Sequence, residues 1–277
     1  NEVANATATG VGKLKVRFIH IPKTAGASFQ QTVWKQGLVD IVNHDECCWN
    51  NDKFDYGEAK DVKVTFLREP RSHVLSQFIH CRHFRQNRNA SRQEDMKALH
   101  TWMTHVSSTS APTYDKNLSR KIFNRPHCYD PRNMQVRYFL CSEARRCSAQ
   151  MSAGHEFWKG QDNIDLAMSH LNELWFFGLK EHFKTSMCLL EWQVRGNVSE
   201  HCRCGASESW ERRNVHGLPK HDVSEILPET LPLVDQITKN DKALYAAAER
   251  VFWERVKVME KDVDKDVSCS GGLKKEL

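Results

Sequence analysis

The sequence predicts an α/β fold in which helices alternate with the strands of a parallel sheet. The prediction depends on one local pattern, a buried strand followed by a tight turn and a helix, which occurs at residues 16–37 and again at 62–79. A third strand at 175–179 precedes a helix at 181–194. Strands that alternate with helices are joined by crossovers and therefore lie parallel. With 277 residues and no visible repeat, the chain fits one large domain.

The first strand–turn–helix pattern reads H-I-P-K-T-A-G-A-S-F over residues 20–29. Pro22 ends the strand because proline has no N–H for the ladder, and Gly26 permits a sharp turn close to a ligand. Ser28 is predicted to cap the helix that follows. Since a helix N-terminus attracts anions and Lys23 adds a positive charge, the segment predicts a phosphate-binding turn. The alternative is an ordinary turn with an exposed lysine.

The second pattern reads F-L-R-E-P-R-S-H-V-L-S over residues 66–76. Pro70 ends the strand, and Ser72 is predicted to cap the next helix. Arg68 suits forked contact with phosphate, and Ser76 lies one helical turn beyond the predicted cap. Ligands of open α/β sheets bind at the carboxyl ends of the strands, so the two turns predict two separate phosphate sites. The alternative is that Arg68 forms a local ion pair with Glu69 and that Ser76 is only a surface hydroxyl.

The remaining chain is divided by its composition. A flexible lead-in is expected at 1–14, a single domain at 15–260 and a flexible tail at 261–277. Within the domain, the polar segments 81–130 and 196–222 are interpreted as insertions that shape an acceptor groove. The further helices predicted from periodicity are 93–106, 133–141, 164–174 and 241–259.

Composition limits the class of protein. A net charge of +5 is too small to indicate a nucleic-acid partner and is compatible with an anionic cofactor or polymer. No run of 18 apolar residues is present, so no membrane span is predicted. Ten cysteines and four N-x-[ST] sequons favour the secretory pathway. Cys141 and Cys147 are candidates for a short disulfide loop, while a zinc site at His201, Cys202 and Cys204 is the alternative use of cysteine. The sequons are at Asn5, Asn89, Asn117 and Asn197.

With both turns considered together, the chain resembles sulfotransferases that use 3′-phosphoadenosine 5′-phosphosulfate (PAPS). Residues 20–29 resemble the 5′-phosphosulfate loop of that family, and residues 66–76 resemble its 3′-phosphate loop. The likeness is strongest to Golgi carbohydrate sulfotransferases, above all the heparan sulfate 6-O-sulfotransferase and sulfotransferase family 2 group. Three further segments are similar to that group: N-M-Q-V-R-Y at 133–138, W-F-F-G-L-K-E at 175–181 and the start of the last helix at 240–245.

The resemblance implies a P-loop-like three-layer fold with a central parallel sheet flanked by helices, and PAPS as donor with no metal required. It implies a glycan acceptor, O-sulfation of the heparan sulfate 6-O type, and a Golgi lumenal or secreted protein whose membrane anchor is absent from this chain. The segments 81–130 and 196–222 match the family poorly, so the acceptor is less defined. Alternatives are a small-molecule hydroxyl as acceptor, a non-catalytic glycan-binding protein, or a nucleotide kinase. The kinase would require a G-K-[ST] turn that the first pattern lacks.

The resemblance also implies roles for particular residues. Lys23 would stabilise charge on the bridging oxygen of the donor, and a histidine would act as base toward the acceptor hydroxyl. His44 lies in the loop where the 6-O group has its catalytic histidine; its alternative is a solvated loop side chain. His80 matches a histidine of the family's second helix; its alternative is a packed helix side chain. His20 is expected to be a core histidine, and Arg137 either lines the acceptor site or braces the sheet. The expected donor-binding residues are Lys23, Thr24, Ala25, Gly26, Ala27, Ser28, Arg68 and Ser76.

Overall fold

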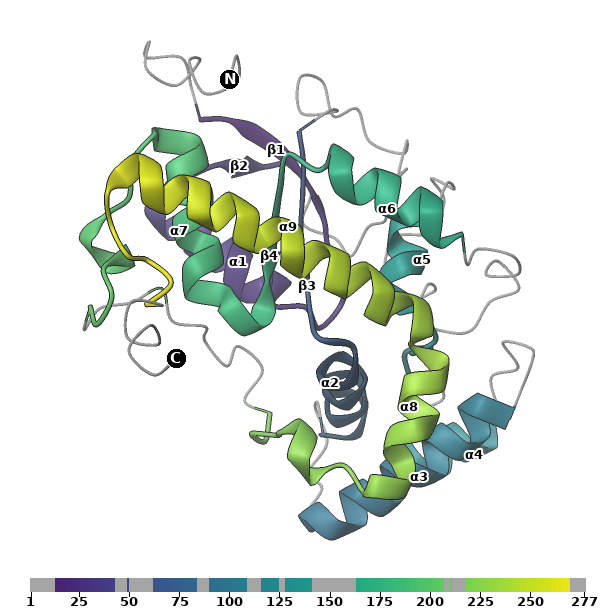
Figure 1. The fold of residues 1–277 in the computed structure, drawn as a ribbon. Helices are drawn as coiled ribbons and strands as arrows, with labels where there is room; N and C mark the ends of the chain where they lie inside the picture. The colour runs from purple at the N-terminus through teal and green to yellow at the C-terminus, as the bar shows by residue number, and fades with distance from the viewer. Residues whose placement is uncertain are drawn as a thin grey trace, which may run out of the picture.

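A four-stranded parallel sheet forms the centre of the fold in a computed structural model (Figure 1). The structure describes residues 13–42, 49, 62–83, 90–108, 116–124, 128–140, 163–206, 210 and 218–269. The strand order is β2-β1-β3-β4, and every neighbouring pair is parallel. The predicted α/β class with a parallel sheet is therefore confirmed. The strands are β1 (Lys15–Ile19), β2 (Asp40–Ile41), β3 (Lys63–Leu67) and β4 (Phe176–Leu179).

Helices cover both faces of the sheet. Adjacent residues of a strand point to opposite faces: Phe176 of β4 stacks near Phe29 of the first helix, while Phe177 lies under Arg255 of the last. Buried aromatic and aliphatic side chains on both faces are typical of parallel sheets between helical layers. The helices are α1 (Gly26–Gln36), α2 (Pro70–His83), α3 (Arg92–Ser108), α4 (Lys116–Phe123), α5 (Met134–Leu140), α6 (Ile164–Glu173), α7 (Phe183–Arg195), α8 (Leu231–Ile237) and α9 (Lys239–Val263).

The central strands are held in register by close packing. Phe18 of β1 is opposite Val64 of β3, and Phe66 of β3 is opposite Gly178 of β4. A Cβ atom at Gly178 would lie 2.5 Å from the ring of Phe66 and 2.9 Å from Cβ of Ser186. Only glycine therefore allows β4 to approach its neighbours so closely.

The first helix starts earlier than the sequence predicts. It begins at Gly26, and the residue before it, Ala25, has φ of +84° and no side-chain oxygen to act as a cap. The predicted cap, Ser28, is instead the third residue of α1. The prediction of a serine cap was wrong because the left-handed Ala25 turns the chain into the helix without a capping side chain.

The second helix also starts before its predicted cap. It begins at Pro70, because the fixed φ of proline suits the first helical position, where no N–H is required. The carboxylate of Glu69 accepts hydrogen bonds from the N–H groups of Arg71 at 3.0 Å and Ser72 at 2.7 Å. The cap is therefore Glu69, and Ser72 lies inside the helix.

The segment interpreted as an insertion at 81–130 contributes a second hydrophobic core. Its described part contains two helices, α3 and α4, where one was predicted, and they pack with α2 and α8. Leu99, Met103 and Phe123 are almost completely buried in this core. A disulfide between Cys81 and Cys128 links the end of α2 to the chain after α4. The helices α3, α4 and α8 lie together below the sheet in Figure 1.

Two further disulfides fix the C-terminal part of the domain. Cys202 is bonded to Cys188 of α7, and Cys204 is bonded to Cys269. The zinc alternative that used Cys202 and Cys204 is therefore wrong. Within the predicted tail, α9 continues to Val263 and Val267 is 1% exposed.

The predicted disulfide between Cys141 and Cys147 lies outside the described residues. Among the residues that the structure describes, no helix is long and apolar enough to cross a membrane. The disulfides Cys81–Cys128, Cys188–Cys202 and Cys204–Cys269 are compatible with a secreted or lumenal protein.

Candidate functional site

The turn between β1 and α1 has an unusual backbone. Lys23 has φ of +67° and Ala25 has φ of +84°, values that residues with a Cβ atom rarely adopt. The hydroxyl of Thr24 is buried and donates to the carbonyl of Ile21 at 2.9 Å, which holds the turn closed. A left-handed residue followed by a helical one directs successive N–H groups toward one point, as in anion-binding nests. The turn is therefore shaped for an anion at the N-terminus of α1.

Gly26 is required in this turn by the side chain of His20. A Cβ atom at Gly26 would lie 2.1 Å from Nε2 of His20 and 2.2 Å from its Cδ2. The His20 ring also stacks on Phe18, with ring centroids 4.9 Å apart. The half-buried His20 thus packs between the strand and the start of α1.

A buried histidine joins the second turn to the first. His73 of α2 is 1% exposed, and its Nε2 donates to the carbonyl of Pro22 at 2.8 Å. Burial lowers the pKa of His73 to about 3, with smaller contributions from the charges of Arg68 and Lys23; the Pro22 carbonyl opposes the shift. His73 is therefore a neutral donor at physiological pH. The sequence analysis did not single it out, since the local sequence gives no sign of the carbonyl opposite.

Arg68 links the two turns directly. Its side chain is almost fully buried, with Nη1 donating to the carbonyl of Lys23 at 2.9 Å and Nε donating to the hydroxyl of Ser72 at 2.9 Å. Its backbone is held by Gln135 of α5, whose amide accepts from the Arg68 N–H at 2.9 Å and donates to the Arg68 carbonyl at 2.8 Å. The guanidinium is thus positioned rigidly beside the Lys23 turn.

The predicted catalytic residues Lys23 and His80 are brought together. Lys23 Nζ lies 3.0 Å from Nδ1 of His80, although 57 residues separate them in the chain. A lysine ammonium only donates hydrogen bonds, so Nδ1 of His80 must be the acceptor. The proton of a neutral His80 ring is then on Nε2. The other predicted base, His44, lies outside the described residues.

Four polar side chains of α2 lie on one side of the helix. Ser72, His73, Ser76 and His80 follow helical spacing, and three of them contact Arg68, Pro22 or Lys23. Ser76 is 4% exposed and shares this side with its neighbours. The structure therefore groups Lys23, Arg68, Ser76 and His80, all of which the sequence singled out.

A segment before α8 adds a histidine that the sequence analysis missed. His221 Nε2 lies 3.5 Å from Nη2 of Arg68, and its Nδ1 donates to the carbonyl of Pro219 at 3.0 Å. With the proton on Nδ1, Nε2 is the acceptor that faces the guanidinium. Only the fold could reveal this contact, because the two residues are 153 positions apart.

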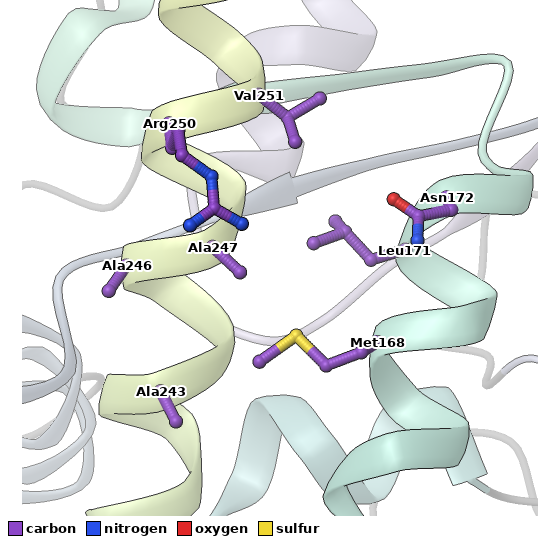
Figure 2. A pocket seen from close by; sticks show the side chains of 8 residues that line it. All are labelled: Met168, Leu171, Asn172, Ala243, Ala246, Ala247, Arg250 and Val251. Carbon is purple, nitrogen blue, oxygen red and sulfur yellow. The ribbon is translucent and has the colours of Figure 1, made fainter.

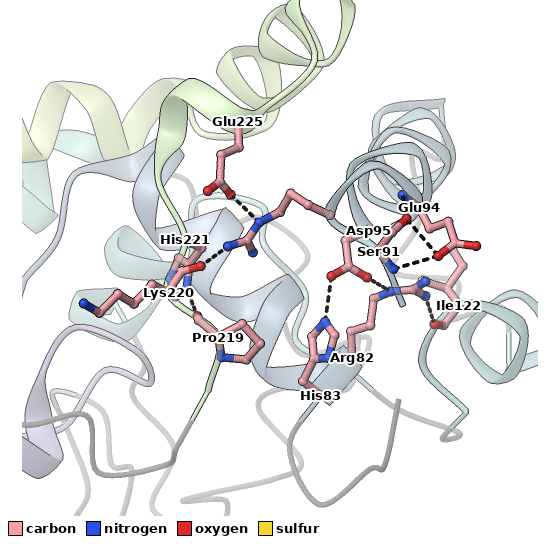
Figure 3. Close-up of polar contacts among 11 residues, drawn as sticks. Arg82, His83, Ser91, Glu94, Asp95, Ile122, Pro219, Lys220, His221 and Glu225 are labelled. Carbon is pink, nitrogen blue, oxygen red and sulfur yellow. Dashed lines mark hydrogen bonds and ion pairs between the residues drawn. The ribbon is translucent and has the colours of Figure 1, made fainter. Parts of the chain in front are cut away.

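Contacts with Arg92 of α3 fix the position of this segment. Arg92 pairs with the carboxylate of Glu225 at 3.1 Å and also donates to the carbonyl of Lys220. Figure 3 shows Lys220, His221 and Glu225 on one side and the Asp95 carboxylate, which contacts Arg82 and His83, on the other. The second core thus supports one wall of the site.

A groove of about 460 Å³ between α6 and α9 lies apart from this site. Met168, Leu171 and alanines of α9 form most of its lining, and Arg250 and Asn172 are its polar groups (Figure 2). None of the predicted site residues lines it. It offers no side chain suited to acid–base or nucleophilic chemistry.

Arg137, for which two roles were left open, contacts Asp130. Its Nη2 donates to the Asp130 carbonyl at 2.5 Å, and its Nη1 lies 3.4 Å from the carboxylate. The side chain is buried. This pairing favours a bracing role between α5 and the segment before it.

Comparison with known proteins does not identify the chain. No protein-family model matches it. No curated protein matches it either.

Proposed function

We propose that the chain is a PAPS-dependent O-sulfotransferase that transfers a sulfuryl group to a hydroxyl of a glycan. The observation that carries this proposal is the contact between the two turns, in which Arg68 Nη1 donates to the Lys23 carbonyl at 2.9 Å. Because β1 and β3 are parallel neighbours, the turns that follow them lie at the same edge of the sheet. Two basic turns in contact suit one ligand that carries two separate phosphate groups.

The residues of each turn fit one end of such a donor. The first N–H groups of α1 are not capped by Ala25, and with Lys23 they would hold the 5′-phosphosulfate. Arg68 and Ser76 would hold the 3′-phosphate, with forked contacts from the guanidinium. The His221 ring beside Arg68 would form part of the same subsite.

The chemistry that PAPS supplies is the transferable sulfuryl group, and the protein must position it and stabilise charge on the leaving oxygen. Lys23 would donate a hydrogen bond to that oxygen as its charge grows. Removal of one such preorganised donor lowers turnover by about 10² to 10³ in other enzymes. The strained φ of Lys23 supports this role, because backbone strain is concentrated at functional sites.

The contact between Lys23 and His80 affects whether His80 can act as the catalytic base. While Lys23 donates to Nδ1, the ring proton of His80 is on Nε2. In this state neither ring nitrogen can accept the proton of the acceptor hydroxyl. When Lys23 turns to the leaving oxygen, Nδ1 is released and can take the proton of the acceptor hydroxyl, so that His80 acts as base and becomes an imidazolium. Under this proposal His80 becomes competent only after the donor is bound, and His44 is the other candidate.

The first test is binding of adenosine 3′,5′-bisphosphate (PAP), which should raise the Tm by mass action. No rise at millimolar PAP would refute the donor assignment. The second test is transfer of label from radioactive PAPS to a panel of glycans and small hydroxylated molecules. If His44→Ala retains full turnover and His80→Ala loses it, His80 is the base; the reverse result assigns His44.

We also propose that the protein acts in the Golgi lumen or outside the cell. The disulfides Cys81–Cys128, Cys188–Cys202 and Cys204–Cys269 support an oxidising compartment.

A further inference from the structure

The side-chain amide of Gln77 is buried without a hydrogen-bond partner. Gln77 lies in α2 and is 0% exposed. Neither its Oε1 nor its Nε2 has a partner among the residues that the structure describes. Buried polar groups are nearly always paired, since an unpaired one forfeits its hydrogen bonds to water. An amide in this state therefore requires an explanation.

Gln135 provides a matched contrast within the same site. It is 1% exposed, and both of its amide atoms are bonded to the backbone of Arg68, at 2.9 Å and 2.8 Å. Among the described residues, two buried glutamines thus lie near the two turns; the amide of Gln135 is paired with protein groups and that of Gln77 is not. The hydrogen bonds of the fold explain why the amide of Gln135 is buried, but they do not explain the burial of the Gln77 amide.

The position of Gln77 places it beside the proposed chemistry. It follows His73 by four residues and precedes His80 by three, so the three side chains lie close together on α2. His73 contacts the Pro22 carbonyl and His80 contacts Lys23 Nζ. The amide is therefore flanked on the helix by two side chains that both reach the first turn.

The chemistry of an amide indicates which ligand would satisfy it. A carboxamide both donates through nitrogen and accepts through oxygen. Phosphate and sulfate groups of the donor only accept, so they would leave Oε1 unpaired. A hydroxyl donates and accepts, and two adjacent hydroxyls of a sugar can engage both atoms of the amide.

We infer that Gln77 is an acceptor-binding residue whose amide pairs with hydroxyls of a sugar beside Lys23 and His80. The inference rests on the proposed function and adds to it the recognition of a sugar diol. Because the amide is not exposed, the acceptor must displace side chains that cover it. The neighbouring Lys23–His80 contact is the one that the proposed chemistry breaks, which would link acceptor binding to donor binding.

The first experiment needs no ligand and compares Gln77→Met with Gln135→Met by thermal unfolding. Methionine keeps a similar length and removes the polar atoms. We expect Gln77→Met to raise the Tm by about 2–4 °C, because an unpaired buried amide is removed. Gln135→Met should lower the Tm, because it leaves the Arg68 backbone unpaired. A fall in Tm for Gln77→Met as large as that for Gln135→Met would show that the amide is paired, and would overturn the inference.

The second experiment measures binding of sugars to the PAP complex by titration calorimetry. The probes are an unsulfated heparan-type oligosaccharide and a simple alcohol without an adjacent hydroxyl. We expect Gln77→Met to keep the PAP-induced rise in Tm and to lower oligosaccharide affinity by at least about 10-fold, with Gln77→Asn intermediate. The alcohol should bind equally to the wild type and the variant.

The outcomes separate the two proposals. If the wild type does not bind PAP, the proposed function fails and the inference fails with it. If the wild type binds PAP but its complex binds no oligosaccharide, or Gln77→Met binds it equally well, only the inference about Gln77 is overturned.

Discussion

The buried His73 makes stability depend on pH in a way that can be calculated. Its pKa falls from 6.5 in the unfolded chain to about 3 in the fold, because burial disfavours the charged ring. Between these values the unfolded chain binds one more proton than the folded protein, so acid favours unfolding. The stabilisation is complete above pH 6.5 and is lost as the pH falls toward 3. From pH 7 to pH 5 the loss amounts to about 2 kcal/mol.

The assay is urea unfolding of the wild type and His73→Gln at pH 7 and pH 5. Glutamine retains a donor for the Pro22 carbonyl but does not titrate, and the other ionisable groups are common to both proteins. We expect the wild type to lose about 2 kcal/mol more than the variant between the two pH values. Equal losses would show that His73 is accessible to protons in the folded state, and the account of the joined turns would be wrong.

Three other variants test the site and its support. Gly26→Ala should lower stability by about 1–3 kcal/mol and weaken PAP binding, because the new Cβ displaces His20; normal binding would contradict the close packing of the turn. Replacing Cys81 and Cys128 together by alanine should lower the free energy of unfolding by about 2–4 kcal/mol, since their disulfide closes a loop across 47 positions; an unchanged urea midpoint would argue against it. Lys23→Ala should lower transfer from PAPS by at least about 100-fold while PAP still raises the Tm, and retained turnover would exclude Lys23 as the charge stabiliser.

The sheet and the long helices could be predicted from sequence because their signals are local. The buried runs that became β1, β3 and β4 and the periodic apolar face of α9 each fix one element without reference to the rest. The two-residue strand β2 has no such signal, since Asp40 is exposed and the pairing comes from β1. The short helices α4 and α8 were missed because tertiary packing in the second core stabilises them more than their own sequence does.

Apart from His80, which the family resemblance indicated, the site residues that could be predicted belong to the two strand–turn–helix patterns. Lys23 and Arg68 stand out because each is a basic residue in the turn that follows a buried strand. The contribution of His221 depends on a contact across 153 positions, and that of Gln77 depends on the lack of a partner in the described fold. Both facts belong to three-dimensional packing and leave no trace in local composition.

The central claim is that the turns at Lys23 and Arg68 bind the two phosphate ends of one nucleotide. Calorimetric titration with PAP, adenosine 5′-monophosphate and adenosine 3′-monophosphate tests it most directly. The account predicts that PAP binds at least about 10-fold more tightly than either monophosphate, because a charge-assisted phosphate contact adds about 1.5–3 kcal/mol. It also predicts that Arg68→Ala removes the preference for PAP over the 5′-monophosphate. Equal affinity of the wild type for PAP and the 5′-monophosphate would contradict the claim.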